Sequence, residues 1–285
     1  MIVDSHCHAW SHWPYRPEVP DPESRGTVEQ LLFEMDQNGV DQAAIICAGI
    51  DFNPDNNGYV AEQVRRHPDR LYQIADVDCL WSPNYHQTGA AGRLRAAAAR
   101  LPLVGFTHYL KPEDDGAWLC SDEGLAFFGA AAELGLLASL ACFPHQQLAV
   151  RRVAERLPEL PILLHHLGLA KVKEPDQFAD VLACARHPNI YLKLSGFYYG
   201  TAGGRWDFPH RDTIEQVRAL YGRFGPGRLC WGSDYPVCRA FISYRQALES
   251  FRTHCDFVPE SEHALILGGN FKHLLRSVRP IAPLF

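Results

Sequence analysis

The chain has 285 residues, 47% of them hydrophobic and 21% charged, with a formal net charge of -6 at pH 7. This composition is typical of a globular protein, and the weak acidity without a basic run argues against a nucleic-acid partner. The sequence has no run near the ~18 consecutive apolar residues of a transmembrane helix, and its N-terminus lacks the pattern of a signal peptide. Nine scattered cysteines without a Cys-x-x-Cys pair predict buried thiols in a reducing compartment, so we expect a cytoplasmic protein with no membrane partner.

Short apolar segments alternate along the chain with segments of helical periodicity. The apolar segments predict eight strands, at Ile2–Ser5, Gln42–Ala48, Leu71–Val77, Leu103–Phe106, Leu136–Ala141, Pro161–Leu164, Ile190–Leu194 and Leu229–Trp231. Helices are predicted between Thr27 and Gly39 and then at Tyr59–His67, Ala90–Arg100, Glu123–Leu134, Gln146–Leu157, Asp176–Arg186, Asp212–Phe224, Tyr244–Thr253, Glu260–Ile266 and Phe271–Ser277. Thr27 with Gln30 predicts a capping box, and Gly268 and Gly269 precede the last predicted helix.

The alternation of strands and helices is typical of a parallel sheet. Eight such repeats match the closure number of a (β/α)8 barrel. An open doubly wound sheet would be favoured by a glycine-rich phosphate loop after the first strand, and no G-x-G-x-x-G motif follows that strand. Because no linker or shift in composition divides the chain, we predict a single-domain TIM barrel that spans residues 1–285.

Titratable side chains collect at the ends of the predicted strands. In a barrel the active site lies at the C-terminal ends of the strands, and burying such side chains there costs several kcal/mol unless they are paired or ligated. The candidates are His6 and His8 on the first strand end, His108 on the fourth, His165 and His166 on the sixth, Lys193 and Ser195 on the seventh and Asp234 on the eighth.

The histidines differ in how firmly their direction can be predicted. The spacing of His6 and His8 places both imidazoles on one face of an extended strand, although such a pair can also simply bond to the backbone. His165 and His166 would point to opposite faces of a continuing strand, so only one of them is expected to face the barrel centre. We select His166, because residues 162–164 already complete the buried strand.

Four of these residues form a predicted metal site. His6, His8, His166 and Asp234 supply nitrogen and oxygen ligands that suit one divalent ion, with zinc as the first choice. An ion with three or four protein ligands can also bind a water and lower its pKa to about 7. Asp234 would take the proton from that water as it attacks a carbonyl, and His166 is the second predicted catalytic residue.

Five segments of the chain, in this order, resemble the amidohydrolase superfamily and within it the amidohydrolase-related family, which contains sugar-lactone and dicarboxylate-lactone hydrolases. These segments are VDSHCHAW at the start, PILLHHLG (Pro161–Gly168), IYLKLSGFY (Ile190–Tyr198), RLCWGSDYPV (Arg228–Val237) and LGGNFKHLL near the end. The resemblance covers nearly the whole chain. It implies a distorted (β/α)8 barrel with His6 and His8 after the first strand and Asp234 after the eighth.

The chain also departs from two patterns within that superfamily. Members with two metals carry a lysine or glutamate ligand after the fourth strand, where this chain offers only His108 and Lys111. Decarboxylases of a related branch have a histidine after the fifth strand, and His145 here follows a proline. The resemblance thus implies at most one metal ion. Some lactonase-like members work without tightly bound metal, in which case the three histidines would polarise the carbonyl and water directly, with Asp234 still the base.

The predicted substrate contacts lie at strand ends and in one loop rich in glycine and aromatic residues. They are His108, Lys193, Tyr198, Tyr199 and Arg239. The loop Phe197–Pro209 predicts a mobile cover for a small ring. Arg239 is either a ligand for a substrate carboxylate or a solvated arginine, and Lys193 is either an electrophile or a strand lysine at the barrel mouth. The segment Trp10–Tyr15 predicts another wall of the pocket.

These observations support three hypotheses about function. The first is a hydrolase that opens a lactone of a small polar acid or sugar acid, and its partner is a small-molecule substrate. The second is a metal-dependent non-oxidative decarboxylase, which needs the fuller ligand set. The third is a non-catalytic small-molecule binding barrel. A homo-oligomer is compatible with the sequence, which determines neither the oligomeric state nor the substrate.

Overall fold

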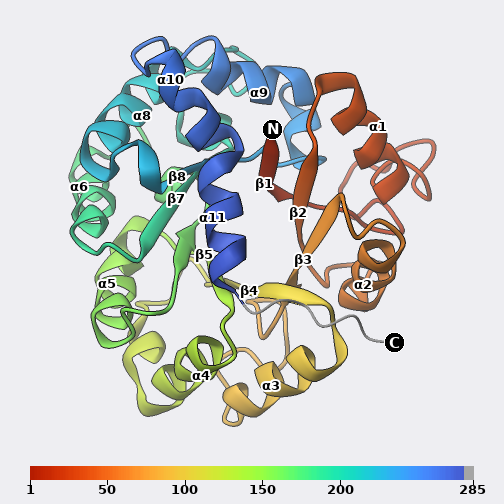
Figure 1. The fold of residues 1–285 in the computed structure, drawn as a ribbon, viewed down its shortest axis with the longest axis vertical. Helices are drawn as coiled ribbons and strands as arrows, with labels where there is room; N and C mark the ends of the chain where they lie inside the picture. Colours follow the sequence, from red (N-terminus) through yellow and green to blue (C-terminus); the bar gives the residue numbers. More distant parts are fainter. Residues whose placement is uncertain (279–285) are drawn as a thin grey trace.

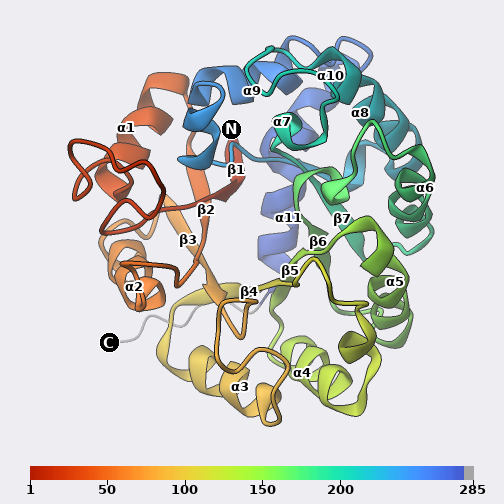
Figure 2. The same cartoon turned by 180° about the vertical axis from the view of Figure 1, so that it is seen from behind.

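The computed structural model describes residues 1–278 and forms a ring of eight parallel strands surrounded by helices (Figures 1 and 2). The strands follow chain order around the ring, and each pairs in parallel with the next. They are β1 (Val3–Cys7), β2 (Gln42–Ile46), β3 (Leu71–Asp76), β4 (Leu103–Tyr109), β5 (Leu137–Ala141), β6 (Ile162–Leu164), β7 (Ile190–Leu194) and β8 (Leu229–Trp231). This confirms the predicted single-domain TIM barrel, of which residues 279–285 lie outside the described part.

Helices cover the outside of the barrel and one of its ends. They are α1 (Val28–Asn38), α2 (Asn56–Arg66), α3 (Ala90–Arg100), α4 (Asp122–Glu133), α5 (Gln147–Arg156), α6 (Pro175–Ala183), α7 (Phe197–Gly200), α8 (Arg211–Phe224), α9 (Tyr244–Arg252), α10 (Glu260–Ala264) and α11 (Asn270–Ser277). Within residues 1–278, no helix is both long enough and apolar enough to span a membrane.

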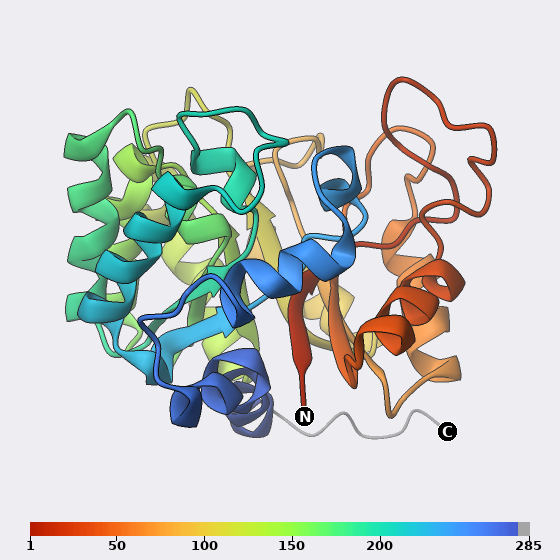
Figure 3. The same ribbon diagram turned by 90° about the horizontal axis from the view of Figure 1, so that it is seen from above.

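The two ends of the barrel differ in what closes them. At the N-terminal end, α11 lies across the opening in Figure 1 and packs Phe271 and Leu274 against inward side chains such as Val3 and Leu163. The loops that follow the strands lie on the opposite side, away from the N-terminus (Figure 3). An apolar plug therefore fills one end, and polar strand-end residues are free to gather at the other.

Two strands run further than the sequence predicts. β1 continues to Cys7 and β4 to Tyr109, so His6 and His108 lie inside strands and their directions follow strand alternation. Gly39 ends α1 as predicted, with a left-handed φ of 67°.

The expectations for two helix boundaries were wrong. The Thr27 side chain does not cap α1, because its hydroxyl donates to the backbone carbonyl of Ser24 at 3.1 Å. Gly268 and Gly269 do not separate two helices. Instead, a π-helical turn (Leu265–Gly269) joins α10 to α11, and Gly269 keeps a helical φ of -55°.

A buried carboxylate holds the seam where β8 meets β1. Asp4 Oδ1 accepts hydrogen bonds from the backbone N–H of Ser233 at 2.9 Å and of His6 at 3.0 Å, and Asp4 Oδ2 accepts from the Tyr244 hydroxyl at 2.9 Å. The Asp4 side chain is fully buried, and burial raises its pKa to about 6 against the opposing effect of these bonds. Next to it, the Ser5 hydroxyl donates to a carbonyl of β8 at 2.7 Å.

The seam also requires a glycine. A Cβ atom on Gly232 would lie 2.7 Å from His6 Cβ and 3.0 Å from His6 N, closer than non-bonded atoms approach. The backbone N–H of Asp234 donates to the His6 carbonyl at 2.8 Å in the same region. The close approach of the two chain segments therefore sets the distance between a predicted ligand on β1 and another after β8.

We expect Gly232→Ala to destabilise the fold by about 1–3 kcal/mol, because the added methyl group overpacks the seam. Gly222→Ala is the matched control, since nothing lies within 4 Å of the added atom on α8. Gly222→Ala should stabilise the fold by roughly 0.5–1 kcal/mol, because alanine is favoured over glycine inside a helix. Urea unfolding of both variants measures the difference, and equal stabilities would contradict the tight seam.

Candidate active site

The structure brings four predicted residues together at the loop end of the barrel. Asp234 Oδ1 lies 3.4 Å from His6 Nε2, 3.6 Å from His8 Nε2 and 3.8 Å from His166 Nε2. All four side chains are nearly or fully buried. Residues from the two ends of the chain and from its middle thus share one small volume.

Local backbone geometry turns two of these side chains inward. His166 and Asp234 have left-handed φ values of 44° and 58°, which fold the chain back just beyond the ends of β6 and β8. Gly196 makes room for this arrangement. A Cβ atom there would lie 2.9 Å from His166 Nδ1 and 2.5 Å from the Tyr199 ring.

Each of the three imidazoles has one ring nitrogen bonded away from the cluster. His8 Nδ1 donates to the Ile46 carbonyl at 2.7 Å, which fixes a proton on Nδ1 and directs Nε2 into the cluster. His166 Nδ1 lies 3.0 Å from Ser195 Oγ, and His6 Nδ1 lies 3.0 Å from Lys193 Nζ. The Ile46 carbonyl and the Ser195 hydroxyl can accept from a ring N–H, as the outer partners of metal-binding histidines do, whereas the Lys193 ammonium is a donor from which His6 Nδ1 accepts.

The two oxygens of Asp234 have different environments. Oδ2 accepts hydrogen bonds from the hydroxyls of Tyr198 at 2.5 Å and Tyr199 at 2.9 Å. Oδ1 faces the histidines and, like His6 Nε2, is buried without a hydrogen-bond partner. The unpaired oxygen and the inward ring nitrogens therefore point into the same space.

Burial decides the charges in this cluster. It lowers the pKa of His6 well below its usual value, aided by the nearby Lys193 cation, and lowers the pKa of His166 to about 4. Burial alone would raise the pKa of Asp234, but the facing His166 and the contacts with His6 and His8 outweigh it and hold that pKa well below 3.8. At neutral pH Asp234 is therefore an ionised carboxylate beside the neutral imidazoles of His6 and His166.

This donor set fits a divalent cation. Ligands about 2.0–2.1 Å from a tetrahedral zinc ion are roughly 3.4 Å from one another, close to the separations seen between Asp234 Oδ1 and the ring nitrogens. His8 Nδ1 is bonded to the Ile46 carbonyl, which leaves Nε2 as the ring nitrogen that faces Asp234. His6, His8 and Asp234 form one group whose ligand atoms all lie within 4.8 Å of one another.

Lys193 does not lie at the barrel mouth, which corrects the predicted place of its side chain. Its side chain is fully buried inside the barrel, where Nζ bonds His6 Nδ1 and donates to Ser139 Oγ at 2.7 Å. Burial lowers the pKa of Lys193 to about 7. The sequence analysis missed Ser139, although its position two residues after the inward Leu137 on β5 would have placed it on the inner face.

His108 is a second correction. Because β4 extends to Tyr109, alternation turns Tyr109 inward, where its ring meets His165 at 5.1 Å. His108 faces outward and is fully buried, with its ring 5.8 Å from Phe127 of α4 and its Nε2 3.2 Å from His86 Nε2. The residue therefore packs between strand and helix and does not reach the Asp234 cluster.

The remaining predicted substrate contacts separate into two kinds. Tyr198 is buried and Tyr199 is half-buried, and the hydroxyls of both donate to Asp234, so these tyrosines position the carboxylate. Arg239 lies 3.7 Å from Glu34 of α1. A protein carboxylate therefore lies near Arg239, and its contact with a substrate carboxylate stays a prediction.

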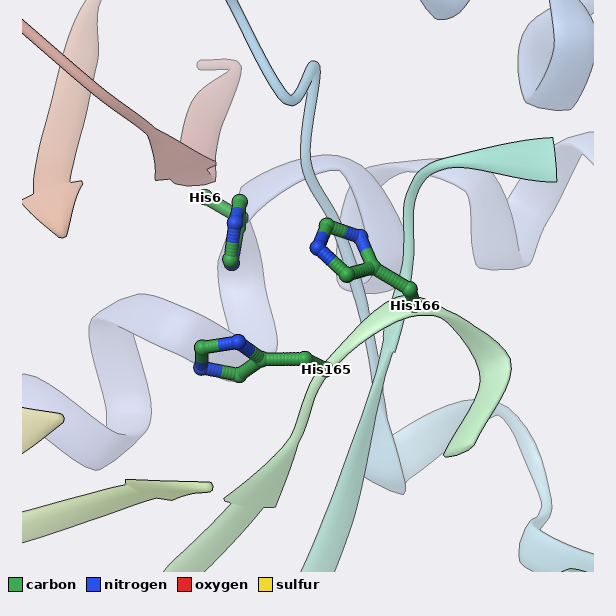
Figure 4. Close-up of side chains that lie close together, drawn as sticks. All are labelled: His6, His165 and His166. Carbon is green, nitrogen blue, oxygen red and sulfur yellow. The ribbon is translucent and has the colours of Figure 1, made fainter. Parts of the chain in front are cut away.

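His165 corrects the expectation that only one histidine of the pair faces the barrel centre. Alternation from the inward Leu163 already turns His165 inward. His166 reaches the same space because β6 ends at Leu164 and the left-handed His166 belongs to the following turn. Figure 4 shows both rings directed toward His6.

The predicted wall at Trp10–Tyr15 lies beside the cluster. The Trp10 ring stacks on His8 with centroids 5.0 Å apart and donates its indole N–H to the Ala48 carbonyl at 2.9 Å. The Tyr15 ring meets Trp10 edge-on at 5.5 Å, and the charge of Asp234 contributes, after burial, to a raised pKa of Tyr15. Aromatic side chains therefore border the cluster on the side of β1.

The barrel thus carries histidines at the ends of β1 and β6 and an aspartate after β8, a donor set that can bind a metal ion or transfer a proton. The family model described as Amidohydrolase matches residues 3–276, a range that contains the whole cluster. The chain belongs to this family and is an enzyme of the amidohydrolase superfamily, as the sequence motifs predict.

A relative in sequence supports this assignment, and solved structures support the fold. The chain is 34% identical over 294 residues to L-fucono-1,5-lactonase from Burkholderia ambifaria, with 98% of this chain and 96% of the relative covered. An amidohydrolase from Burkholderia multivorans with bound zinc has a TM-score of 0.78 at 19% identity, covering 97% of this chain and 99% of that one. 5-Carboxyvanillate decarboxylase from Sphingomonas paucimobilis has a TM-score of 0.67 at 17% identity, covering 98% and 99%. The two structures share the fold with this chain.

We expect Tyr198→Phe to lower the stability of the protein at pH 7 by about 1.5–3 kcal/mol, because a buried ionised carboxylate loses a hydrogen-bond donor. Tyr221→Phe is the matched control, since it removes a hydroxyl that donates to Glu262 near the surface. Its effect should stay within about 0.5 kcal/mol. Chemical denaturation of both variants tests this, and similar losses would contradict the support of Asp234 by Tyr198.

Proposed function

We propose that this enzyme hydrolyses a lactone of a small polar acid, with Asp234 as the general base. The observation that carries the proposal is the pairing of an unbonded, ionised Asp234 Oδ1 with inward ring nitrogens of His6, His8 and His166. Whole-length similarity to L-fucono-1,5-lactonase supports lactone hydrolysis as the reaction.

The reaction needs a nucleophilic water and a group that accepts its proton. Asp234 Oδ1 is free to accept that proton while Tyr198 and Tyr199 hold Oδ2 and fix the carboxylate plane. The water oxygen bonds to the ring carbonyl carbon, the ring C–O bond breaks, and Asp234 returns the proton to the departing ring oxygen. The product is an open hydroxy acid, which releases a proton when its carboxyl group ionises.

His6, His8, His166 and Asp234 would hold one divalent cation, with zinc as the proposed ion. When bound, such an ion supplies Lewis acidity that lowers the pKa of water and stabilises negative charge on the carbonyl oxygen. The chain itself supplies neutral imidazoles, because burial lowers the pKa values of His6 and His166. It also excludes bulk water, because the cluster is almost completely buried.

The charges near the cluster favour an uncharged lactone ring. Arg239, the predicted carboxylate ligand, is next to Glu34, and the buried Lys193 is bonded to His6 and Ser139. Trp10 is buried against His8 and Tyr15, so the half-buried Tyr15 is the aromatic residue of this pair that a sugar ring can contact. We therefore propose a neutral sugar lactone over a dicarboxylate lactone.

We expect the wild-type protein to open L-fucono-1,5-lactone faster than a dicarboxylate lactone, and Asp234→Asn to lower the rate by about 10²–10⁴-fold through loss of the base. Proton release followed with a pH indicator measures both rates. Glu159→Gln, which changes an exposed carboxylate, is the control and should leave the rate unchanged. Equal rates for wild type and Asp234→Asn would refute the role of Asp234 as general base. If the wild type turned over neither lactone, the proposal that lactones are the substrates would be refuted.

The metal proposal makes a separate prediction. Protein that is stripped with chelator and incubated with Zn²⁺ should bind one ion per chain after gel filtration, because the four side chains form one site. His8→Ala should weaken binding by more than about 10-fold, since even loss of an outer partner costs that much. His12→Ala removes a nearby histidine of the following loop and should bind zinc normally. Elemental analysis gives the stoichiometry, and zinc bound equally by both variants would disprove the role of His8.

A further inference from the structure

Tyr109 lies at the end of β4 and belongs to none of the roles assigned so far. It is the last residue of the strand, and its ring packs against the apolar cluster on the inner face of the barrel. The Tyr109 ring meets the His165 ring with centroids 5.1 Å apart, and His165 in turn meets His6 at 4.5 Å. Tyr109 therefore borders the histidines that surround Asp234.

Neighbouring rings fix Tyr109 without using its hydroxyl. The His165 ring stands at 80° to the ring of Tyr109, and the Trp81 ring lies 5.0 Å from it at 45°. Trp81 is itself held in place, because its indole N–H donates to Asp76 Oδ2 at 2.6 Å. The orientation of the Tyr109 side chain thus depends on aromatic contacts alone.

The Tyr109 hydroxyl has no structural use. The side chain is half-buried, and within residues 1–278 its hydroxyl has no hydrogen-bond partner, whereas the hydroxyls of Tyr198 and Tyr199 are bonded to Asp234. Phenylalanine would make the same ring contacts. Because the hydroxyl of a buried tyrosine usually has a partner, a free one at the edge of the site is available to a ligand.

Tyr15 approaches the site from another part of the chain in the same manner. Its ring meets Trp10 at 5.5 Å and Trp13 at 5.3 Å. Tyr15 is half-buried, and its hydroxyl also has no hydrogen-bond partner in the part of the chain that the structure describes. Trp10 stacks on His8, so Tyr15 comes from the side of β1 and Tyr109 from the side of β4.

The charge of Asp234 acts on both free hydroxyls. Burial raises the pKa of Tyr109 and that of Tyr15 well above the usual value, and the Asp234 carboxylate adds to the shift of each. Interactions between charges weaken with distance, so both hydroxyls lie near Asp234. Each hydroxyl keeps its proton at neutral pH and can therefore both donate and accept a hydrogen bond.

We propose that the hydroxyls of Tyr15 and Tyr109 form a subsite that binds the ring hydroxyl groups of the lactone. This inference rests on the proposed function and narrows its substrate to a lactone whose ring carries free hydroxyl groups. An uncharged O–H that donates and accepts matches an alcohol, which has the same two capacities. A carboxylate on the ring would instead be repelled by the nearby Asp234.

The test compares two lactones with the same ring size. L-Fucono-1,5-lactone carries hydroxyl groups on its ring, and δ-valerolactone carries none. Loss of a hydroxyl that binds the substrate lowers kcat/KM for the first lactone alone. Loss of a hydroxyl that stabilises the oxyanion would lower kcat/KM for both, because the reacting carbonyl is common to them.

We expect Tyr109→Phe and Tyr15→Phe each to lower kcat/KM for L-fucono-1,5-lactone by about 3–10-fold, mainly through a higher KM. The rate with δ-valerolactone should stay within about two-fold, which also shows that each variant is folded. Tyr191→Phe is the matched control, because it removes a hydroxyl from the inner face near the end that α11 closes. It should change neither rate. Proton release followed with a pH indicator measures every variant.

The outcomes separate this inference from the proposed function. If either Tyr109→Phe or Tyr15→Phe matches the wild type on L-fucono-1,5-lactone, the subsite is disproved and the lactonase activity stands. Equal losses on both lactones overturn the subsite as well. If no variant opens δ-valerolactone, the sugar lactone decides: a higher KM supports the subsite, and a lower kcat at unchanged KM overturns it. If the wild type opens neither lactone, the proposed function fails and the subsite fails with it.

Discussion

The contact between β8 and β1 is the constraint on which the rest of the site depends. Gly232 lets the backbone after β8 approach His6 closely, and Asp4 ties the two segments through backbone N–H groups. Asp234 then bonds the His6 carbonyl through its own N–H. Closure of the barrel between β8 and β1 therefore also sets the distances from the Asp234 carboxylate to His6 and His8. The same few bonds stabilise the fold and position the site.

Burial gives this cluster its chemical character. Imidazoles in water would be partly protonated near neutral pH, but inside the barrel the lost solvation favours their neutral form. The carboxylate stays ionised because tyrosine hydroxyls and ring nitrogens replace its water. Neutral nitrogen ligands beside one anionic oxygen are what a divalent cation requires, and the same low pKa values leave the carboxylate free of protons.

Strand alternation explains which site residues could be predicted. The His6 and His8 pair, Asp234 and the fold followed from motif spacing and from the count of alternating elements. The directions of His108 and of the His165–His166 pair did not, because β4 continues past His108 and β6 ends at Leu164, which releases His166 from strand alternation. Lys193 points to the barrel centre, but only the neighbouring strands show that it is covered there.

The sequence by itself determined the (β/α)8 class, the family resemblance and the set of histidines and acid available for catalysis. These depend on periodicity and on local motifs, which are properties of neighbouring residues. Only the tertiary structure decided that Tyr198 holds Asp234, that Arg239 pairs with Glu34, and that Ser139 links Lys193 to His165. Those contacts join residues far apart in the chain, and their geometry is set by ring closure and packing, which no local pattern encodes.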